Sequence, residues 1–426
     1  MLPFKRIYPF FIFFIANAYL LKGQEVSPYS QYGLGDVQSK NFAAAKGFGG
    51  ASSAFRNSLF INPVNPASYS SLVLTTMEFG VNANYKSMQI GDSTYTTGDG
   101  FIDYIALGFP ISKSVGTSVG LIPFSKTNYS YQQTIDDPDL GEVSKLYRGK
   151  GRLYRLYAGA AYQFPKTDTA KHLFSVGANM VYIFGQNEFA QGVSFPSNQN
   201  AFNSRQTSEI RFGDFAWDFG LQYKLKLEGE QHLVFGASAE LPFNVKTTRI
   251  NTYEKFRPVS PSLTIIDTIG ESSAVKEKLG FPFIYRAGFS YSKSDRLTTF
   301  FDFEYSTWSR FQPSYQRDID YEDSWRISGG LEYVPKPSKK FFNQLIYRLG
   351  AYYDRGFFSI NGQQISEFGT SFGLSFPLKS AFSKINVSLE GGSRGSNAEG
   401  LIKENFFRTY ISLTLNDKWF VKRKYE

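Results

Sequence analysis

The sequence predicts an all-β protein: a transmembrane antiparallel β-barrel of about 14 strands with an N-terminal hatch inside its lumen. Three observations predict it. Many segments alternate between apolar and polar residues, their apolar positions are crowded with aromatic side chains, and short turns alternate with long connections. Successive side chains of a strand point to opposite faces, so each segment has one apolar and one polar face. A barrel with lipid outside and water inside requires that pattern.

The alternation is clearest between Phe281 and Tyr333, a stretch that reads as three consecutive strands. Its middle strand sets aromatic residues against polar ones: Phe301, Phe303 and Tyr305 against Asp302, Glu304 and Ser306. A large soluble β-sandwich would also alternate and is the alternative fold. The chain has 43 Phe and 28 Tyr. Such enrichment in aromatic residues is typical of membrane interfaces and favours the barrel.

Residues 1–23 are expected to be a cleaved signal peptide. Lys5 and Arg6 form a positive start, and an apolar core follows over residues 8–21, ending near Gly23. This core is too short to span a bilayer as a helix. Export combined with barrel strands predicts the outer membrane of a bacterium with two membranes.

Residues 24–70 do not alternate, and we expect them to fold as a compact hatch that plugs the barrel. The segment is rich in small residues and glycine and contains two Asn-Pro turns. A loosely ordered periplasmic extension is the alternative. The candidate hatch residues lie in these turns: Asn62, Pro63, Asn65, Pro66 and Ala67.

Residues 71–417 are expected to form the barrel, and residues 418–426 a basic periplasmic tail. The strand-like segments are 72–88, 101–110, 115–133, 150–164, 172–186, 210–227, 231–248, three within 281–333, 344–354, 367–378, 384–391 and 405–416. Long loops are expected at 89–100, 134–149, 188–208, 249–280, 307–322 and 393–404. Short turns lie between them, as in outer-membrane barrels, where the long loops face outward.

The third predicted strand contains a proline, in the sequence Ile122-Pro123-Phe124. Proline has no N–H, so it must break a ladder hydrogen bond or mark a bulge. These three residues are candidates for a lateral gate. The alternative is a bulge that only helps the wall to curve.

Charged residues occupy lumen-facing positions of neighbouring strands: Arg286, Asp302, Glu304, Arg326, Glu332 and Arg348. Buried charges need partners, and the alternating signs supply them across the ladder. We interpret these residues as a structural charge network in the lumen. A polar permeation path is the alternative.

The sequence offers no catalytic residues, no metal site and no cofactor site. It has no cysteine, and its two histidines, His172 and His232, lie near predicted periplasmic turns. The acidic run from Asp136 to Asp139 lacks the spacing of a calcium loop. The net charge of +9 is spread along the chain, so we expect no nucleic-acid partner.

Several motifs resemble the FadL/OmpP1/TodX family of outer-membrane transporters. The resemblance rests on the Asn65-Pro66-Ala67 element, the strand count and the segment from Arg348 to Tyr353. The opening segment Ser27–Asp36 and the closing segment Leu415–Phe420 resemble the Bacteroidota members of that family. It implies passive uptake of hydrophobic small molecules, such as long-chain fatty acids or aromatic hydrocarbons, which pass the hatch and leave laterally near the third strand.

The implied partners are outer-membrane lipid and the hydrophobic ligand. The alternative is a non-transporting barrel subunit of a secretion or barrel-assembly complex, which would bind other envelope proteins.

Overall fold

The computed structural model confirms the predicted barrel with a hatch in its lumen. It describes residues 27–418 except 167–169, 197–200, 242–243, 260–261, 314–318, 337, 379–381 and 399. The predicted signal peptide, and the predicted tail after Lys418, lie outside the described residues. In the part of the chain that is described, no helix is long and apolar enough to cross a membrane.

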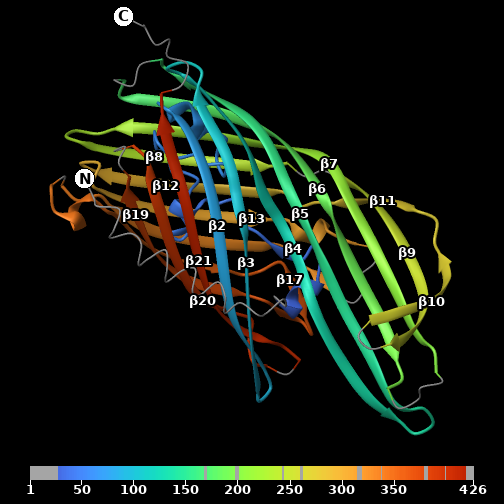
Figure 1. Ribbon diagram of the computed structural model, residues 1–426. Helices are drawn as coiled ribbons and strands as arrows, with labels where there is room; N and C mark the ends of the chain where they lie inside the picture. Colours follow the sequence, from blue (N-terminus) through green and yellow to red (C-terminus); the bar gives the residue numbers. More distant parts are fainter. Residues whose placement is uncertain are drawn as a thin grey trace, which may run out of the picture.

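Antiparallel pairing of successive strands builds the barrel wall (Figure 1). The 14 wall strands are β2 (Thr75–Ile90), β3 (Ser93–Pro110), β4 (Val115–Asp137), β5 (Gly141–Phe164), β6 (His172–Ser194), β7 (Asn203–Lys226), β8 (Gln231–Glu240), β12 (Ile284–Lys293), β13 (Leu297–Ser306), β15 (Ser324–Tyr333), β16 (Ile346–Asp354), β19 (Glu367–Pro377), β20 (Lys384–Arg394) and β21 (Lys403–Asp417). The first and last of them pair from Thr75↔Asp417 to Gln89↔Lys403 and close the barrel. Closure removes the unpaired edges that lipid could not satisfy.

The two faces of the wall have the predicted character. Phe289 and Phe301 point outward and are 42% exposed, whereas Ser290 and Asp302 point inward and are 3% and 6% exposed. This distribution places aromatic side chains toward lipid and polar side chains toward the lumen.

The wall is much taller on one side than on the other. Strands β4–β7 run for 23 or 24 residues, whereas β8, β12, β13 and β15 have 10. A tilted strand needs only about 9–11 residues to span a membrane. The outer parts of β4–β7, joined by β9 (Asn244–Val259), β10 (Ser262–Glu271) and β11 (Val275–Gly280), therefore form a sheet beyond the bilayer, which we call the extension.

The extension corrects several loop predictions. The predicted loops at 89–100 and 134–149 are strand ends joined by tight turns, at residues 91–92 and 138–140, and most of 188–208 is also strand. The predicted strand 231–248 is two strands, because β8 ends at Glu240 and β9 then pairs with the outer part of β7. Outside lipid, both faces of a strand are wet, so these segments lack the alternation that marks the membrane-spanning parts.

The hatch, here residues 27–74, lies inside the ring of strands and appears in dark blue in Figure 1. It contains η2 (Pro28–Gln31), β1 (Asp36–Val37), α2 (Ala43–Lys46) and η3 (Pro66–Ser71). Helix η3 contacts β3–β7, and α2 contacts β19–β21 on the opposite wall. Two further 3-10 turns, η4 (Trp308–Arg310) and η5 (Phe341–Gln344), and a small sheet of β14 (Asp320–Tyr321), β17 (Phe358–Ile360) and β18 (Gln363–Gln364) complete the fold.

Candidate functional site: the hatch and the seam between β3 and β4

The hatch packs against the lumen wall like the core of a soluble domain. Phe48, Phe55 and Phe60 of the hatch form an aromatic cluster with Phe300 of β13. The rings of Phe48 and Phe300 stack with centroids 4.4 Å apart. Burial of several aromatic side chains contributes strongly to folding stability. We therefore infer that the hatch is an integral part of the folded barrel.

The two predicted Asn-Pro turns hold the hatch together and fasten it to the wall. The Asn62 amide donates to the carbonyls of Ser52 and Phe55, at 2.7 and 3.0 Å. The Asn65 amide donates to Leu221 O at 3.0 Å and Ala237 O at 3.2 Å, which belong to wall strands β7 and β8. Asn65 also caps η3, because its Oδ1 accepts from the N–H of Ala67 at 3.2 Å.

The wall makes room for this turn with glycine. A Cβ on Gly220 would lie 2.1 Å from Asn65 Oδ1, and a Cβ on Gly177 would lie 2.5 Å from the carbonyl carbon of Pro66. Pro63 and Ala67 are also buried there. Asn65, Pro66 and Ala67 therefore contact the wall, whereas Asn62 holds the hatch together from within.

The hydrogen-bonded ladder between β3 and β4 is incomplete. The two strands pair only from Ile105↔Leu121 to Pro110↔Gly116. Further toward the extension, β3 pairs with β2, β4 pairs with β5, and among the described residues no ladder joins β3 to β4. Figure 1 shows the two strands diverging from this point. We call the resulting gap the seam.

The predicted gate residues lie at the point where the seam begins. The register between β4 and β5 shifts between Pro123 and Ser125, which is a β-bulge. Ile122 and Phe124 are 2% and 4% exposed, and every residue from 122 to 127 is buried. The bulge thus coincides with the seam, and the predicted gate residues are buried there.

A strand of the hatch fills the seam at the bulge. Strand β1 pairs antiparallel with β4, with Asp36 opposite Lys126 and Val37 opposite Ser125. On either side, Gln38 N donates to Phe124 O at 2.8 Å and Ser27 N donates to Asn128 O at 3.4 Å. The hatch therefore supplies the strand that β3 does not supply.

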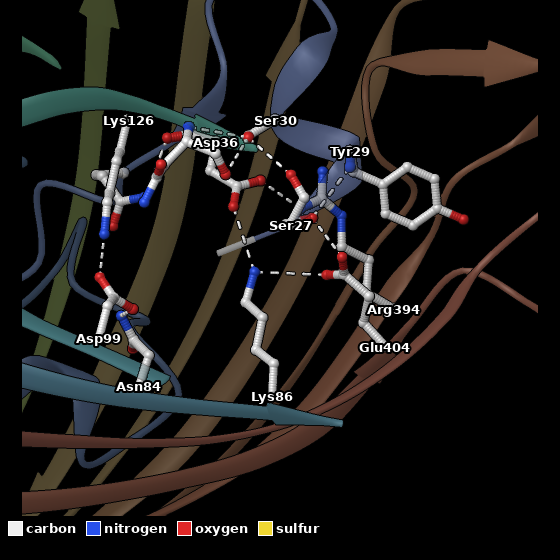
Figure 2. A network of polar contacts seen from close by, with 12 residues as sticks. Ser27, Tyr29, Ser30, Asp36, Asn84, Lys86, Asp99, Lys126, Arg394 and Glu404 are labelled. Atoms are coloured by element: carbon white, nitrogen blue, oxygen red, sulfur yellow. Dashed lines mark hydrogen bonds and ion pairs between the residues drawn. The ribbon is translucent and has the colours of Figure 1, made fainter. Parts of the chain in front are cut away.

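A buried charge network anchors β1 to the opposite side of the seam (Figure 2). Lys86 Nζ of β2 lies 3.3 Å from Asp36 Oδ2 and 3.4 Å from Glu404 Oε2 of β21. Arg394 of β20 donates to Asp36 Oδ1 at 2.5 Å, and the Ser27 hydroxyl donates to Glu404. Burial alone would raise the pKa of Asp36, but Lys86 and Arg394 hold that pKa well below its usual range.

Side chains also bridge the seam directly. Lys126 of β4 forms an ion pair with Asp99 of β3, and Asn84 donates to the same carboxylate at 3.2 Å. The guanidinium of Arg152 lies 4.6 Å from the ring centroid of Phe101 on β3, a cation–π contact. An ion pair and a cation–π contact thus connect the two sides of the seam where ladder hydrogen bonds are missing.

The six predicted lumen charges all point inward, but they do not form a single network. Arg286 contacts Glu304 at 2.5 Å, and Arg348 contacts Glu332 at 2.7 Å. The other two have different neighbours. Asp302 accepts from the N–H of Ser53 in the hatch at 2.7 Å. Arg326 lies 3.7 Å from Asp354 and 3.7 Å from the ring centroid of Tyr352.

The sequence prediction missed most charges that join the hatch to the wall. Lys40 Nζ lies 2.8 Å from both Asp218 and Glu240, and Lys46 Nζ lies 3.1 Å from Asp103. The two lysines lie in the hatch, where no periodicity shows which way a side chain points. Their acidic partners do occupy inward positions of alternating strands, and that signal could have identified them.

Two cavities border the hatch. A polar chamber of about 160 Å³ lies between the hatch and the wall and is lined by Asp36, Lys86 and Arg326, among others. An apolar cavity of about 30 Å³ lies beside Phe124 and Trp308, which is about the volume of one water molecule. A third cavity, of about 380 Å³, lies in the extension, away from the seam, with a mixed polar and apolar lining.

The described residues contain no group of three or more side chains that could hold a metal ion. The Nδ1 atom of His172 lies 2.7 Å from the Tyr223 hydroxyl, and that of His232 lies 3.5 Å from Asp295. The acidic run begins at the end of β4, and Asp137 caps its own turn by accepting from the N–H of Asp139 at 3.0 Å. These contacts are local and structural.

Comparisons with known proteins agree with this architecture. A family model described as BamG matches residues 4–426. The toluene transporter TodX of Pseudomonas putida has a similar structure, with a TM-score of 0.58, 13% sequence identity, and coverage of 89% of this chain and 99% of that one. A Pseudomonas aeruginosa FadL homologue gives a TM-score of 0.56 and 13% identity, and covers 89% of this chain and 98% of that one.

The CymD monoaromatic hydrocarbon channel gives a TM-score of 0.55 and 15% identity, with 89% and 99% of the two chains covered. At these identities the likeness concerns the fold. No curated protein matches the chain.

Proposed function

The chain belongs to the BamG family, and we propose that this outer-membrane barrel serves as a non-transporting subunit of a barrel-assembly or secretion complex. The observation that carries the proposal is the filled lumen. The hatch occupies the space between the walls, is bonded to strands on opposite sides, and supplies a strand to the seam. The match to the BamG family model supports this role.

The sizes of the cavities support a structural rather than a conducting lumen. A binding site for a small hydrophobic molecule needs about 300 Å³ or more of mostly apolar space. The chamber between the hatch and the wall is about 160 Å³ and lined largely by polar and charged side chains, and the apolar cavity near Phe124 is about 30 Å³. A hydrophobic ligand on this route would have to displace both β1 and buried ion pairs.

Passive uptake of hydrophobic small molecules is the second candidate. The specific observation in its favour is the seam, which begins at Pro123 and is closed by the hatch rather than by β3. In this alternative, β1 withdraws from β4 and a fatty acid or aromatic hydrocarbon leaves sideways into the membrane.

A disulfide lock separates the two functions. Val37 and Ser125 are cross-strand partners, and opposed Cα atoms of antiparallel strands lie within the range that a disulfide bridges. Because the chain has no cysteine, the double variant Val37→Cys/Ser125→Cys would fasten β1 to β4 with a single bond. The matched control is Leu107→Cys/Val119→Cys, a partnered pair in the closed part of the same strands.

We expect the locked protein to support growth and to co-purify with the same envelope proteins as the unmodified chain in mild detergent. Uptake of a labelled fatty acid or of toluene should not depend on the lock. Uptake that fails when the lock is oxidised, recovers on reduction, and is unaffected in the control pair would overturn the subunit proposal and establish transport. The subunit proposal would also be overturned if the native barrel purified without other envelope proteins and with a hydrophobic small molecule bound.

We further propose that the chain is exported with a cleaved signal peptide of residues 1–23 and is of the Bacteroidota type. The apolar core that follows Lys5 and Arg6 supports export. Mass spectrometry of the mature N-terminus tests it, with Gln24 as the expected first residue.

A further inference from the structure

The outer part of β4 forms an exposed sheet edge. Between Tyr129 and Asp137, β4 pairs with β5 on one side, from Tyr129↔Gly149 to Asp137↔Gly141. Its other side faces the seam, where Ser27, Ser30 and Gln31 of the hatch contact β4 through hydrogen bonds but, among the described residues, no strand pairs with β4 between Tyr129 and Asp137. Residues 130–136 are all exposed.

The direction of the backbone groups on this edge follows from the neighbouring contacts. Asn128 directs its carbonyl to Ser27 N, at 3.4 Å, and its N–H to Ser30 Oγ, at 3.1 Å, so both groups point into the seam. Backbone groups alternate sides along a strand. The N–H and carbonyl groups of Ser130, Gln132 and Thr134 therefore also point away from β5, into solvent.

This edge lacks the usual protection against strand addition. Exposed edges normally carry lysine, proline or a bulge that discourages pairing, and Ser130–Ile135 contains no proline and no charged residue. The edge is also rigid, because β5 pairs with all of it, and Gln132 Nε2 donates to Ser144 Oγ at 2.9 Å across the hairpin.

Strand addition already occurs on the adjoining part of the same edge. Strand β1 pairs with Ser125 and Lys126, a few residues before the exposed part begins at Ser130. The side chains beyond it suggest a preferred sequence. Tyr131 stacks on Tyr147 with centroids 5.0 Å apart, and an acidic tip follows at Asp136 and Asp137.

We propose that the edge of β4 from Ser130 to Asp136 binds an extended segment of a partner protein by β-strand addition. The segment continues the position of β1, places aromatic or β-branched side chains beside Tyr131, where cross-strand pairs of this kind are favourable, and carries a basic residue near Asp136. This inference rests on the proposed role as a complex subunit, and names the surface that holds the partner.

Single-cysteine variants test the inference, since the natural chain has no cysteine. Ser130→Cys, Gln132→Cys and Thr134→Cys are each labelled with a thiol-directed photo-crosslinker in intact cells, and the crosslinked residues are mapped by mass spectrometry. The control is Gln191→Cys, an exposed residue in the extension whose strand is paired on both sides, with Tyr147 and Gln206. We expect the three variants to crosslink to the same partner segment in strand register: moving the label by two residues on β4 moves the crosslinked position by two residues on the partner.

A blocking variant makes the test specific to backbone pairing. Thr134→Pro removes an N–H that points to the free side and leaves the ladder with β5 intact, because proline is tolerated at such edge positions. Thr134→Val keeps the N–H and is the matched control. We expect loss of the in-register crosslinks in Thr134→Pro, with Gln132 as the labelled site, and retention in Thr134→Val.

Heat-dependent migration on gels verifies that the Thr134→Pro barrel has folded. If it has not, Gln132→Pro, at the next position with the same backbone direction, takes its place, with Ser130→Cys as the labelled site. Crosslinks to residues 24–26 of the same chain or to a second copy of the chain would overturn the inference. A crosslinking yield no higher than that of the Gln191→Cys control would also overturn it. The inference is also overturned if the folded Thr134→Pro variant co-purifies with envelope proteins and crosslinks to them as the wild type does. In that case the proposed function would stand. A wild-type barrel that purifies without envelope proteins would instead contradict the proposed function.

Discussion

Lys86 Nζ lies 3.3 Å from Asp36 Oδ2 and thereby joins a wall strand of the barrel to the hatch strand that fills the seam. Lys86 is on β2, and β1 pairs with β4 across the gap left by β3. This ion pair, with the one between Arg394 and Asp36, couples the position of the hatch to closure of the wall. Its buried location makes it sensitive to loss of either partner.

Asp36→Asn is expected to loosen the hatch at the seam. The substitution leaves the ammonium of Lys86 and the guanidinium of Arg394 with one carboxylate fewer, and loss of one partner from a buried ion pair costs about 3–5 kcal/mol. The measurement is the labelling rate of a cysteine at Ser125, which is fully buried under β1. The rate should rise in Asp36→Asn, while Asp92→Asn, at the exposed turn between β2 and β3, should leave it unchanged.

The same carboxylate predicts a pH dependence. The pKa of Asp36 in the folded protein is below its usual value, because Lys86 and Arg394 outweigh the effect of burial. The ion pairs therefore contribute fully above the pKa of an unfolded aspartate, about 4, and their contribution is lost as the pH falls through the folded pKa. Labelling at Ser125→Cys, carried out at each pH with a dithiodipyridine reagent that also reacts with thiols in acid, should be constant from pH 8 to about 5 and increase below about 4. An Asp36→Asn background should show a smaller change.

Gly35→Ala is expected to displace β1 from β4. A Cβ at Gly35 would lie 2.4 Å from the carbonyl oxygen of Lys126, and the residue has φ +88°. Strain of this kind costs about 1–3 kcal/mol. Gly91→Ala is the matched control, because Gly91 also has positive φ but no atom within 4 Å of the added Cβ.

Protease sensitivity of the hatch is the readout for this pair. If Gly35→Ala and Gly91→Ala behave alike, the close approach of Gly35 to β4 has no role in holding the hatch.

Periodicity explains which parts of this structure could be predicted from sequence. The membrane-spanning strands alternate, so residues such as Phe301 and Asp302 could be assigned to opposite faces. Pro123 marked the site of an irregular ladder, because a residue without an N–H limits pairing wherever it occurs. The extension could not be recognised, since its strands are wet on both faces and their residues do not alternate.

The contacts of the hatch depend on tertiary arrangement rather than on local sequence. Lys86 and Glu404 meet only because the first and last strands pair to close the barrel. Asp36 joins them because β1, which follows a turn with positive φ at Gly33 and Gly35, pairs with β4 beside the seam. Both contacts join residues that lie far apart in the sequence, so no periodic pattern along the chain predicts them.

Asn65→Ala is expected to destabilise the barrel as a whole. The side chain caps η3 and donates to carbonyls of β7 and β8, and it is 0% exposed. Loss of a cap costs about 1 kcal/mol, and each carbonyl left unsatisfied adds roughly 1–3 kcal/mol. Thermal unfolding in detergent should show a lower midpoint than in Asn405→Ala, a substitution at an exposed position of β21. An equal midpoint would show that the turn at Asn65 does not fasten the hatch to the wall.

Arg348 and Glu332 should behave as a coupled pair. Arg348 is 1% exposed, and its Nε donates to Glu332 Oε2 at 2.7 Å while Nη1 donates to Ser375 Oγ at 2.5 Å. Arg348→Met leaves the carboxylate of Glu332 buried without its cation, which costs about 3–5 kcal/mol. The double variant Arg348→Met/Glu332→Gln removes both charges and should recover much of that loss. Denaturant unfolding of the wild type, both single variants and the double variant measures the coupling energy. Additive single-variant effects would mean that the two side chains contribute independently and that the lumen tolerates an unpaired charge.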